Sequence, residues 1–574
     1  MTSAELNLEP LPGKVYKNFL RTWSEAFIYF VLVDRFHDSA TRLSQRGSSE
    51  RGQGYGTAEQ LGDFCGGTLK GIEHHLDYIA GLGCTALWLS PVFGNNPHCY
   101  HGYAIQNYLD VDPHFGSRQD LIDLVDAAHR REMRVILDIV LNHSGDNWSY
   151  EPDVDYYYDQ DRQYPFGHFR PGREPIPTEL RNPDYYHRRG QIRDWESFPE
   201  YAHGDFFGLK DFNNDFELPG NEPARELMDV LIRCHCSWLR DADIDGFRVD
   251  AVKHMGPAAV ALFSSQLREY AESLGKRSFF LFGELVGGDD AINRYIGPNT
   301  AMEYKGNTVF FGLDSVLDYP LYFALPEVMK GRNSPARLFE RYEAQRRRAL
   351  SRGRLGRFLV TFLDNHDGVG QSPKHRYAAD ANDLQVIASI GYLLCALGTP
   401  CIYYGTEQGL AGQGDSDSAI REAMFDLDHP GRNNLNTNCS IYQEIAKLAA
   451  VYHSQPALRF GRMYFRQISG NGRDFGFPQG AGATLAFARI LAQGEVLVAY
   501  NTSAEEARHD YVMVDDNLHR EGDRWEFLYG GTGSLEVLSQ PDSGNQMARF
   551  VQLHLLPNQF VILSRSKSGT KAEV

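Results

Sequence analysis

Eight short apolar runs recur between residues 26 and 450, and helical patterns separate them. Each run is rich in β-branched and aromatic residues, which is typical of a parallel strand buried on both faces. Between the first two runs, Leu69, Ile72, Leu76 and Ile79 recur at helical spacing. Eight strands that alternate with helices predict a closed parallel barrel. The runs are 27–33, 85–90, 134–140, 246–252, 279–285, 307–313, 358–364 and 401–405.

Two parts of the chain depart from this alternation of strands and helices. Residues 144–213 are rich in Tyr, Asp, Pro, Gly and Arg and have weak periodicity, which after a barrel strand predicts a small inserted subdomain. From residue 455 the pattern changes to short alternating runs, which predict an antiparallel β-sandwich. We therefore expect a (β/α)8 TIM barrel in 1–143 and 214–454, a subdomain B in 144–213 and a C-terminal β-sandwich in 455–574.

Composition argues against some classes of partner and cellular location. The net charge of −18 argues against a nucleic-acid partner, which requires a basic face. The N-terminus lacks the apolar core of a signal peptide, and the early apolar run at 26–33 is too short to span a bilayer. The eight scattered cysteines favour free, buried thiols over disulfides or a zinc site. We expect a cytoplasmic protein without a membrane partner; the sequence does not indicate an oligomeric state.

Three carboxylates stand at the C-terminal ends of three predicted strands. They are Asp250 in GFRVDAVKH, Glu284 in FFLFGEL and Asp367 in TFLDNHD. A charged group is costly inside a core, but it belongs at the catalytic mouth of a barrel. The pattern predicts acid-assisted chemistry on a polar, uncharged substrate.

The segments around these acids resemble conserved regions of the α-amylase superfamily, glycoside hydrolase family 13. They occur in the family's order, and the resemblance covers most of residues 24–450. The resemblance implies retaining cleavage of an α-glycosidic bond. The matching segments are DIVLNH (138–143), GFRVDAVKH (246–254), FGEL (282–285), FLDNHD (362–367) and GTPCIYYGTE (398–407).

The resemblance assigns one role to each acid. Asp250 is the expected nucleophile, Glu284 the general acid and then base, and Asp367 the third acid, which holds sugar hydroxyls in the transition state. In a retaining mechanism the two reacting carboxyls lie about 5 Å apart. Burial and neighbouring acids are expected to raise the pKa of Glu284. Arg248, two residues before Asp250, points to the same side of the strand and is expected to orient Asp250 and keep it ionised.

Further residues are implied to contact the substrate. The pair Lys253–His254 resembles that of α-amylases and cyclodextrin-forming enzymes, which favours an α-1,4-glucan. Ala104 and Gly370 stand where exo-acting α-glucosidases of the family carry an aspartate and an arginine, so we expect an open pocket. The predicted contacts to the sugar chain are Tyr103, His101, His143, Arg248, Lys253, His254 and His366.

The resemblance also implies a calcium site. Asn142 matches a calcium ligand of many α-amylases, Asp211 is the candidate ligand from the inserted segment, and the His254 carbonyl completes the shell. Such oxygen ligands suit Ca²⁺. In the alternative, Lys210, immediately before Asp211, replaces the charge of the ion. No organic cofactor is expected.

The function expected first is hydrolysis of α-1,4-linked glucans or maltooligosaccharides through a glycosyl–Asp250 intermediate. A transglycosylase on the same scaffold is the first alternative, because exclusion of water from the acceptor site, rather than the acids, sets that balance. A hydrolase or isomerase of a small α-glucoside such as sucrose or trehalose is the second. A non-catalytic sugar-binding relative is disfavoured, because all three acids are present.

Overall fold

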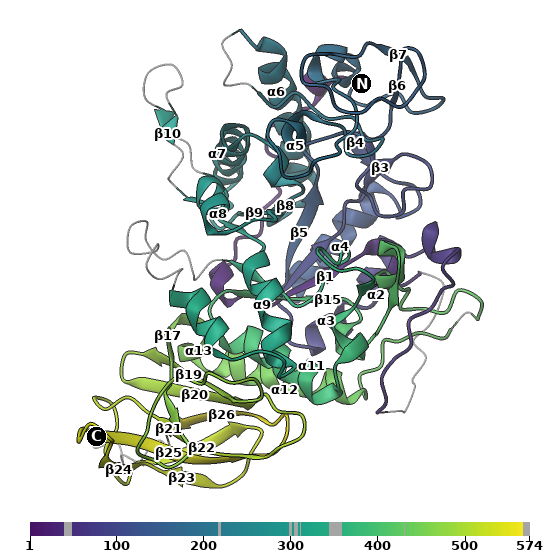
Figure 1. The fold of residues 1–574 in the computed structure, drawn as a ribbon. Helices are drawn as coiled ribbons and strands as arrows, with labels where there is room; N and C mark the ends of the chain where they lie inside the picture. The colour runs from purple at the N-terminus through teal and green to yellow at the C-terminus, as the bar shows by residue number, and fades with distance from the viewer. Residues whose placement is uncertain are drawn as a thin grey trace.

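The computed structural model describes residues 1–38, 49–215, 220–297, 301–302, 308–309, 312–343, 359–429 and 431–565. In this part of the chain, eight parallel strands form the predicted barrel (Figure 1). A parallel bridge between Leu317 and Val360 joins the two ends of the sheet. In sheet order the strands are β12 (Ser315–Val316), β9 (Phe280–Gly283), β8 (Gly246–Val249), β5 (Arg134–Ile139), β2 (Ala86–Leu89), β1 (Ile28–Val31), β15 (Thr399–Tyr403) and β13 (Val360–Thr361).

The predicted sixth strand, 307–313, is wrong. Within that run, β11 (Thr308–Val309) pairs antiparallel with β10 (Ala301–Met302), outside the barrel, and residues 307, 310 and 311 lie outside the described residues. The sixth barrel strand is β12, where Ser315 pairs with Phe282 of β9. A strand of two residues carries no periodicity, and the longer apolar run before it produced the wrong assignment.

Helices cover the barrel, and their ends carry ordinary capping signals. At the start of α4, Ser117 accepts a hydrogen bond from the Asp120 amide, and Asp120 bonds back to Ser117. All eight cysteines are free thiols and six of them are buried. Among the described helices, each is too short or too polar to cross a lipid bilayer. The main helices are α2 (Leu69–His74), α3 (Leu76–Gly81), α4 (Arg118–Arg130), α6 (Glu222–Ala242), α7 (Pro257–Ser273), α8 (Asp289–Tyr295), α9 (Tyr319–Met329), α11 (Asp383–Cys395), α12 (Ser440–Ser454) and α13 (Pro456–Phe460).

The inserted segment leaves the barrel after β5 and returns to the same place. It contains a hairpin of β6 (Trp148–Tyr150) and β7 (Phe166–Phe169), and the short helix α5 (Glu200–His203). An antiparallel bridge between His143 and Asp211 ties its last residues to the end of β5. The segment is therefore held at the barrel mouth.

The C-terminal part is a sandwich of two antiparallel sheets around its own apolar core, and Figure 1 shows it at the end of the molecule away from the β6–β7 hairpin. Buried Arg489 donates to the Cys395 and Ala396 carbonyls at the end of α11, at 2.6 and 2.5 Å, and so joins sandwich to barrel. The predicted limits at 143, 213 and 454 stay predictions as domain boundaries. The two sheets contain β17 (Arg462–Phe465), β19 (Thr484–Leu491), β20 (Gly494–Asn501), β26 (Phe560–Arg565), β22 (Arg524–Tyr529) and β23 (Ser534–Glu536), and β18 (Ile468–Ser469), β21 (Arg508–Met513), β25 (Met547–Leu555) and β24 (Leu538–Pro541).

Candidate active site

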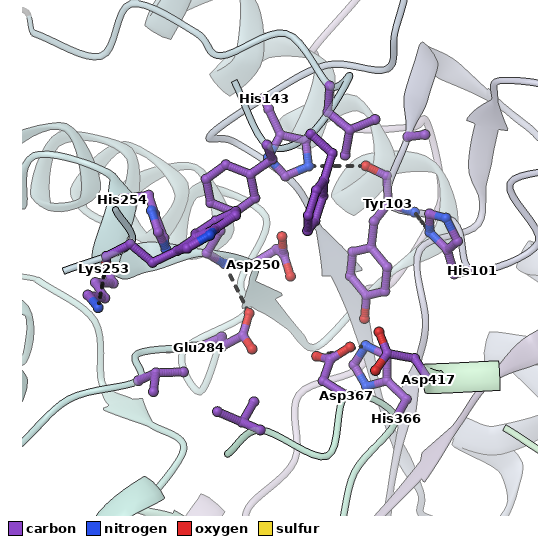
Figure 2. A pocket seen from close by; sticks show the side chains of 18 of the residues that line it. His101, Tyr103, His143, Asp250, Lys253, His254, Glu284, His366, Asp367 and Asp417 are labelled. Atoms are coloured by element: carbon purple, nitrogen blue, oxygen red, sulfur yellow. Dashed lines mark hydrogen bonds and ion pairs between the residues drawn. The ribbon is translucent and has the colours of Figure 1, made fainter. Parts of the chain in front are cut away.

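The carboxyl ends of the barrel strands open onto a cavity of about 860 Å³. Asp250 directly follows β8, Glu284 directly follows β9, and Asp367 lies in the loop after β13. All three line the cavity, and in Figure 2 their carboxylates face the same space. The structure thus brings together the three acids that the sequence singled out.

Arg248 is the fully buried centre of this cluster. Its Nη1 lies 2.6 Å from Asp250 Oδ1 and 2.9 Å from Asp138 Oδ1, and its Nη2 lies 2.9 Å from Glu284 Oε2. Strand register explains the contacts with Asp138 and Glu284, because Arg248 stands beside Asp138 on β5 and beside Phe282 on β9, two residues before Glu284. The sequence linked Arg248 to Asp250 alone, whereas the guanidinium holds three carboxylates.

The charge balance of the cluster favours retention of a proton. Burial raises the pKa of Asp250 well above its usual range; Arg248 opposes this shift, and Glu284, Asp138 and Asp367 add to it. Burial also raises the pKa of Asp138 to about 6, against the influence of Arg248. Several carboxylates around one guanidinium cannot all be ionised without a large cost. That Glu284 is the protonated acid stays a prediction.

Glu284 is held by two further donors. The Tyr319 hydroxyl, from α9, donates to Oε1 at 3.1 Å, and the Ala251 amide donates to Oε2 at 3.2 Å. Ala251 has a φ of 51°, an unusual value for a residue with a Cβ. This backbone turn directly after Asp250 directs the amide toward Glu284, and such strain is typical of functional sites.

Asp367 is paired with an arginine that the sequence did not indicate. Arg421 Nη2 lies 3.0 Å from Asp367 Oδ1, and Arg421 Nε donates to the His366 carbonyl at 2.8 Å. Beside them, Lys374 Nζ pairs with Asp417 Oδ1 at 3.0 Å, and both line the cavity. Arg421 follows a short 3-10 helix in the loop after β15 and lies in no segment that carries the family resemblance.

Tyr103 and three histidines form the opposite wall. The Tyr103 hydroxyl donates to Asp138 Oδ2 at 3.0 Å, and its ring stacks on His366 with the ring centroids 5.2 Å apart. His143 Nε2 bonds the Tyr103 carbonyl at 3.2 Å, and His101 Nδ1 bonds the Tyr103 amide at 3.1 Å. Burial lowers the pKa of His143 to about 4, that of His101 to about 3 and that of His366 well below its usual value. These imidazoles are therefore neutral near pH 7 and act through hydrogen bonds.

Lys253 and His254 line the cavity and join it to the inserted segment. Lys253 Nζ donates to the Trp195 carbonyl at 3.0 Å and pairs with Glu196 Oε1 at 2.7 Å. His254 Nδ1 donates to the Tyr201 carbonyl at 2.6 Å. The loop after β8 is thereby fixed against the segment that forms the facing wall.

An aromatic group on that wall was missed from the sequence. The Phe206 ring lies 4.4 Å from His254 and 5.0 Å from His143, between centroids, and Trp195 packs against it. Phe207, also on the cavity wall, is 71% exposed and has a φ of 56°. A bulky residue exposed in this strained conformation is typical of a ligand contact. The segment's weak periodicity gave no signal for it.

The predicted calcium ligands do not fit a calcium ion. Asn142 and Asp211 are adjacent, with Asn142 Nδ2 donating to Asp211 Oδ1 at 3.2 Å. The other oxygen of Asp211 lies 2.5 Å from His187 Nδ1, so both oxygens already have partners. Even with Asn142 Oδ1, which lacks a hydrogen-bond partner, and the predicted His254 carbonyl, the set falls short of the roughly six to eight oxygen ligands that calcium requires. The cation beside Asp211 is also not Lys210, which pairs with Asp205 at 3.3 Å.

Comparisons with known proteins agree with the fold and the resemblance. The chain is 30% identical to an α-amylase of Streptomyces lividans over 82% of this chain and 56% of that protein, so it spans little more than half of that relative. It is 27% identical to a cyclomaltodextrin glucanotransferase of Klebsiella oxytoca, over 78% of this chain and 67% of that one. The crystal structure of an Anoxybacillus α-amylase superposes with a TM-score of 0.68 at 25% identity, covering 95% and 99% of the two chains.

The family model for the α-amylase catalytic domain matches residues 30–436, from β1 through the loop that carries Arg421. This range is most of the chain and includes every residue of the carboxylate cluster. The chain belongs to the α-amylase family of glycoside hydrolases.

Proposed function

We propose that this protein is a retaining α-glycoside hydrolase that acts on α-1,4-linked glucans or maltooligosaccharides. The observation that carries the proposal is the pair of carboxylates on one guanidinium: Asp250 and Glu284 both contact Arg248, at 2.6 and 2.9 Å. A retaining mechanism requires the nucleophile and the acid about 5 Å apart, on either side of the scissile bond. The shared contact with Arg248 supports such a pairing of Asp250 and Glu284.

In the first step, Glu284 gives its proton to the glycosidic oxygen while Asp250 attacks the anomeric carbon. The carbon–oxygen bond breaks, and a glycosyl ester forms on Asp250. In the second step, Glu284 removes a proton from water, which attacks the same carbon and releases Asp250. Arg248 holds Asp250 in position, and the Tyr319 hydroxyl orients Glu284. Asp367 binds sugar hydroxyls and is itself held by Arg421. No step requires calcium.

Several features support an oligosaccharide over a single small sugar. The cavity volume of about 860 Å³ lies near the upper end of the range for ligand pockets, about 300–1,000 Å³. Ala104 and Gly370 line it without the side chains that would enclose one terminal glucose. The aromatic faces of Trp195 and Phe207 extend the wall in the direction of Lys253 and suit stacking on further sugar rings.

Transglycosylation is the second candidate, and the same aromatic wall favours it. Trp195, Phe206 and Phe207 line the cavity with apolar faces, and such faces in an acceptor site receive a sugar and exclude water. The acids are the same in both reactions. Products from maltoheptaose separate them: longer or rearranged products indicate transfer, and only shorter ones indicate hydrolysis.

The test is a substrate panel of maltooligosaccharides, isomaltose, trehalose, sucrose and cyclodextrins, with products resolved. We expect cleavage of maltooligosaccharides with retention at the anomeric carbon. Turnover of sucrose or trehalose alone contradicts the proposed substrate. Asp250→Asn is expected to lose about 10⁴-fold or more in kcat, because the nucleophile is removed. An Asp250→Asn enzyme as active as the parent contradicts the assignment of Asp250 as the nucleophile.

A further inference from the structure

Two histidines and an aspartate meet where the inserted segment returns to the barrel. They are His187, His203 at the end of α5, and Asp215 in the loop between α5 and α6. One ligand atom from each lies within 4.8 Å of the others. None of the three lines the carboxylate cavity, and the proposed reaction uses none of them.

The spacing suits a small tetrahedral ion. Asp215 Oδ2 lies 3.0 Å from His203 Nε2 and 3.4 Å from His187 Nε2. Ligands about 2.0–2.2 Å from a tetrahedral zinc ion are separated by roughly such distances. The His187 side chain is 8% exposed, and its buried Nε2 faces Asp215 without forming a well-aligned hydrogen bond. The His187 and His203 rings stack with their centroids 4.4 Å apart, and the Nε2 atoms of both lie beside Asp215 Oδ2. Two imidazole nitrogens and a carboxylate oxygen are ligands that a transition metal accepts.

The other nitrogen of His187 is already positioned. His187 Nδ1 lies 2.5 Å from Asp211 Oδ2, and Asp211 is fixed in turn by Asn142 Nδ2 at 3.2 Å. A metal-bound histidine commonly donates its second N–H to a carboxylate in this way, which fixes the tautomer and directs the free lone pair to the metal. The hydrogen bond between His187 and Asp211 therefore occupies Asp211 and leaves His187 Nε2 available to a metal ion that prefers nitrogen ligands.

We propose that His187, His203 and Asp215 bind a divalent transition metal of the Zn²⁺ class, with water in the fourth position. Asp211 orients His187 without binding the ion. The metal joins α5 to the return segment, and α5 also carries Tyr201, whose carbonyl bonds His254. The ion therefore has a structural role: it cross-links two parts of the inserted segment behind the cavity wall.

A proton is the competitor for the same position. Burial lowers the pKa of His187, but Asp211 and Asp215 outweigh it and raise this pKa to about 9. Without metal, an imidazolium held between the two acids satisfies the site, so binding must displace that proton. The two descriptions predict different results when metal is added to the full chain.

The experiment uses chelator-treated, full-length protein titrated with Zn²⁺ by calorimetry and with Co²⁺ by visible absorption. We expect one equivalent bound, tetrahedral Co²⁺ bands and a higher Tm with Zn²⁺ but not with Ca²⁺. His203→Ala is expected to abolish the Co²⁺ bands, and Asp211→Asn to weaken Zn²⁺ affinity about 10–100-fold. His168→Ala, in the same segment and outside the cluster, is the matched control and keeps full binding.

Absence of stoichiometric Zn²⁺ binding to the parent protein overturns the proposal and leaves the proton as the occupant. Binding that survives both His203→Ala and Asp215→Asn overturns it as well. Near-UV circular dichroism of each variant at 20 °C establishes that it is folded. Asp215→Asn keeps the shape of the side chain, so it serves where His203→Ala does not fold.

Discussion

Replacing Arg421 tests whether Asp367 works as the proposed site requires. Arg421 Nη2 lies 3.0 Å from Asp367 Oδ1, and the Asp367 side chain is 30% exposed. A hydrogen bond between charged groups contributes about 1.5–3 kcal/mol, and partial exposure places this one near the lower end. Because each 1.36 kcal/mol is a factor of ten, Arg421→Met is expected to lower kcat/KM on maltoheptaose by about 10–30-fold.

Measuring kcat and KM separately shows whether Arg421 acts by positioning Asp367 or only by stabilising the fold. Asp367 is proposed to bind sugar hydroxyls most strongly in the transition state, so the loss is expected mainly in kcat, with little change in KM. Arg421→Lys keeps the charge, but one ammonium group replaces a fork that reaches both Asp367 and the His366 carbonyl. The lysine variant is expected to recover part of the activity.

Arg376→Lys is the matched control. Arg376 is as buried as Arg421 and pairs with Glu422 and the Tyr404 carbonyl, but it contacts none of the three acids. It is expected to lower Tm and leave kcat unchanged. A fall in kcat of less than threefold in Arg421→Met, or an equal fall in Arg376→Lys, refutes the positioning role.

Three further outcomes follow from other parts of the molecule. Burial lowers the pKa of His235 to about 4, so as the pH falls the unfolded chain takes up this proton before the folded chain does. The free energy of unfolding therefore falls by up to about 3 kcal/mol between pH 6.5 and 4. In urea unfolding, His235→Phe is expected to show a smaller difference in this free energy between pH 7 and pH 4.5. Arg489→Met leaves the Cys395 and Ala396 carbonyls without their donor and is expected to cost about 2–4 kcal/mol by urea unfolding, with kcat unchanged. Ca²⁺ and a calcium-selective chelator are expected to leave Tm unchanged, because Asp211 is already paired with His187; a clear Ca²⁺-dependent rise restores the calcium prediction.

Periodicity and strand position explain what the sequence could predict. Six of the eight barrel strands fall within the predicted runs and a seventh, β15, overlaps its run, because each lies in a continuous apolar run between helices. The sixth failed because Ser315–Val316 lies outside every predicted run, shortly after the apolar run 307–313 that predicts a strand. Asp250 and Glu284 were recognisable because each directly follows a strand, and parallel strands of a barrel bring such residues to one mouth. The cytoplasmic location stays a prediction.

The parts that failed depend on contacts between segments remote in sequence. Arg421 meets Asp367 across 54 positions, and no local pattern indicates that pairing. Phe207 and His187 lie in the inserted segment, whose aromatic and polar residues follow no helical or strand period. Lys210 was the nearest cation to Asp211 in sequence, but the fold places His187 there instead. Sequence proximity is a poor guide in such a segment, because turns and bridges decide which side chains meet.

The carboxylate cluster and the aromatic wall of the cavity come from different parts of the chain. Asp250, Glu284 and Arg248 stand on or directly after barrel strands, whose register brings them together, and Asp367 lies in the loop after β13. The facing wall belongs to the inserted segment and is bonded to the loop after β8 through Lys253, which contacts the Trp195 carbonyl and Glu196, and through His254, which contacts the Tyr201 carbonyl. Changes in that wall can therefore alter which molecule reaches the glycosyl intermediate without disturbing the acids that form it. We therefore expect substitutions at Phe206 or Phe207 to change the ratio of transfer to hydrolysis products from maltoheptaose, and Asp250→Asn to lower both.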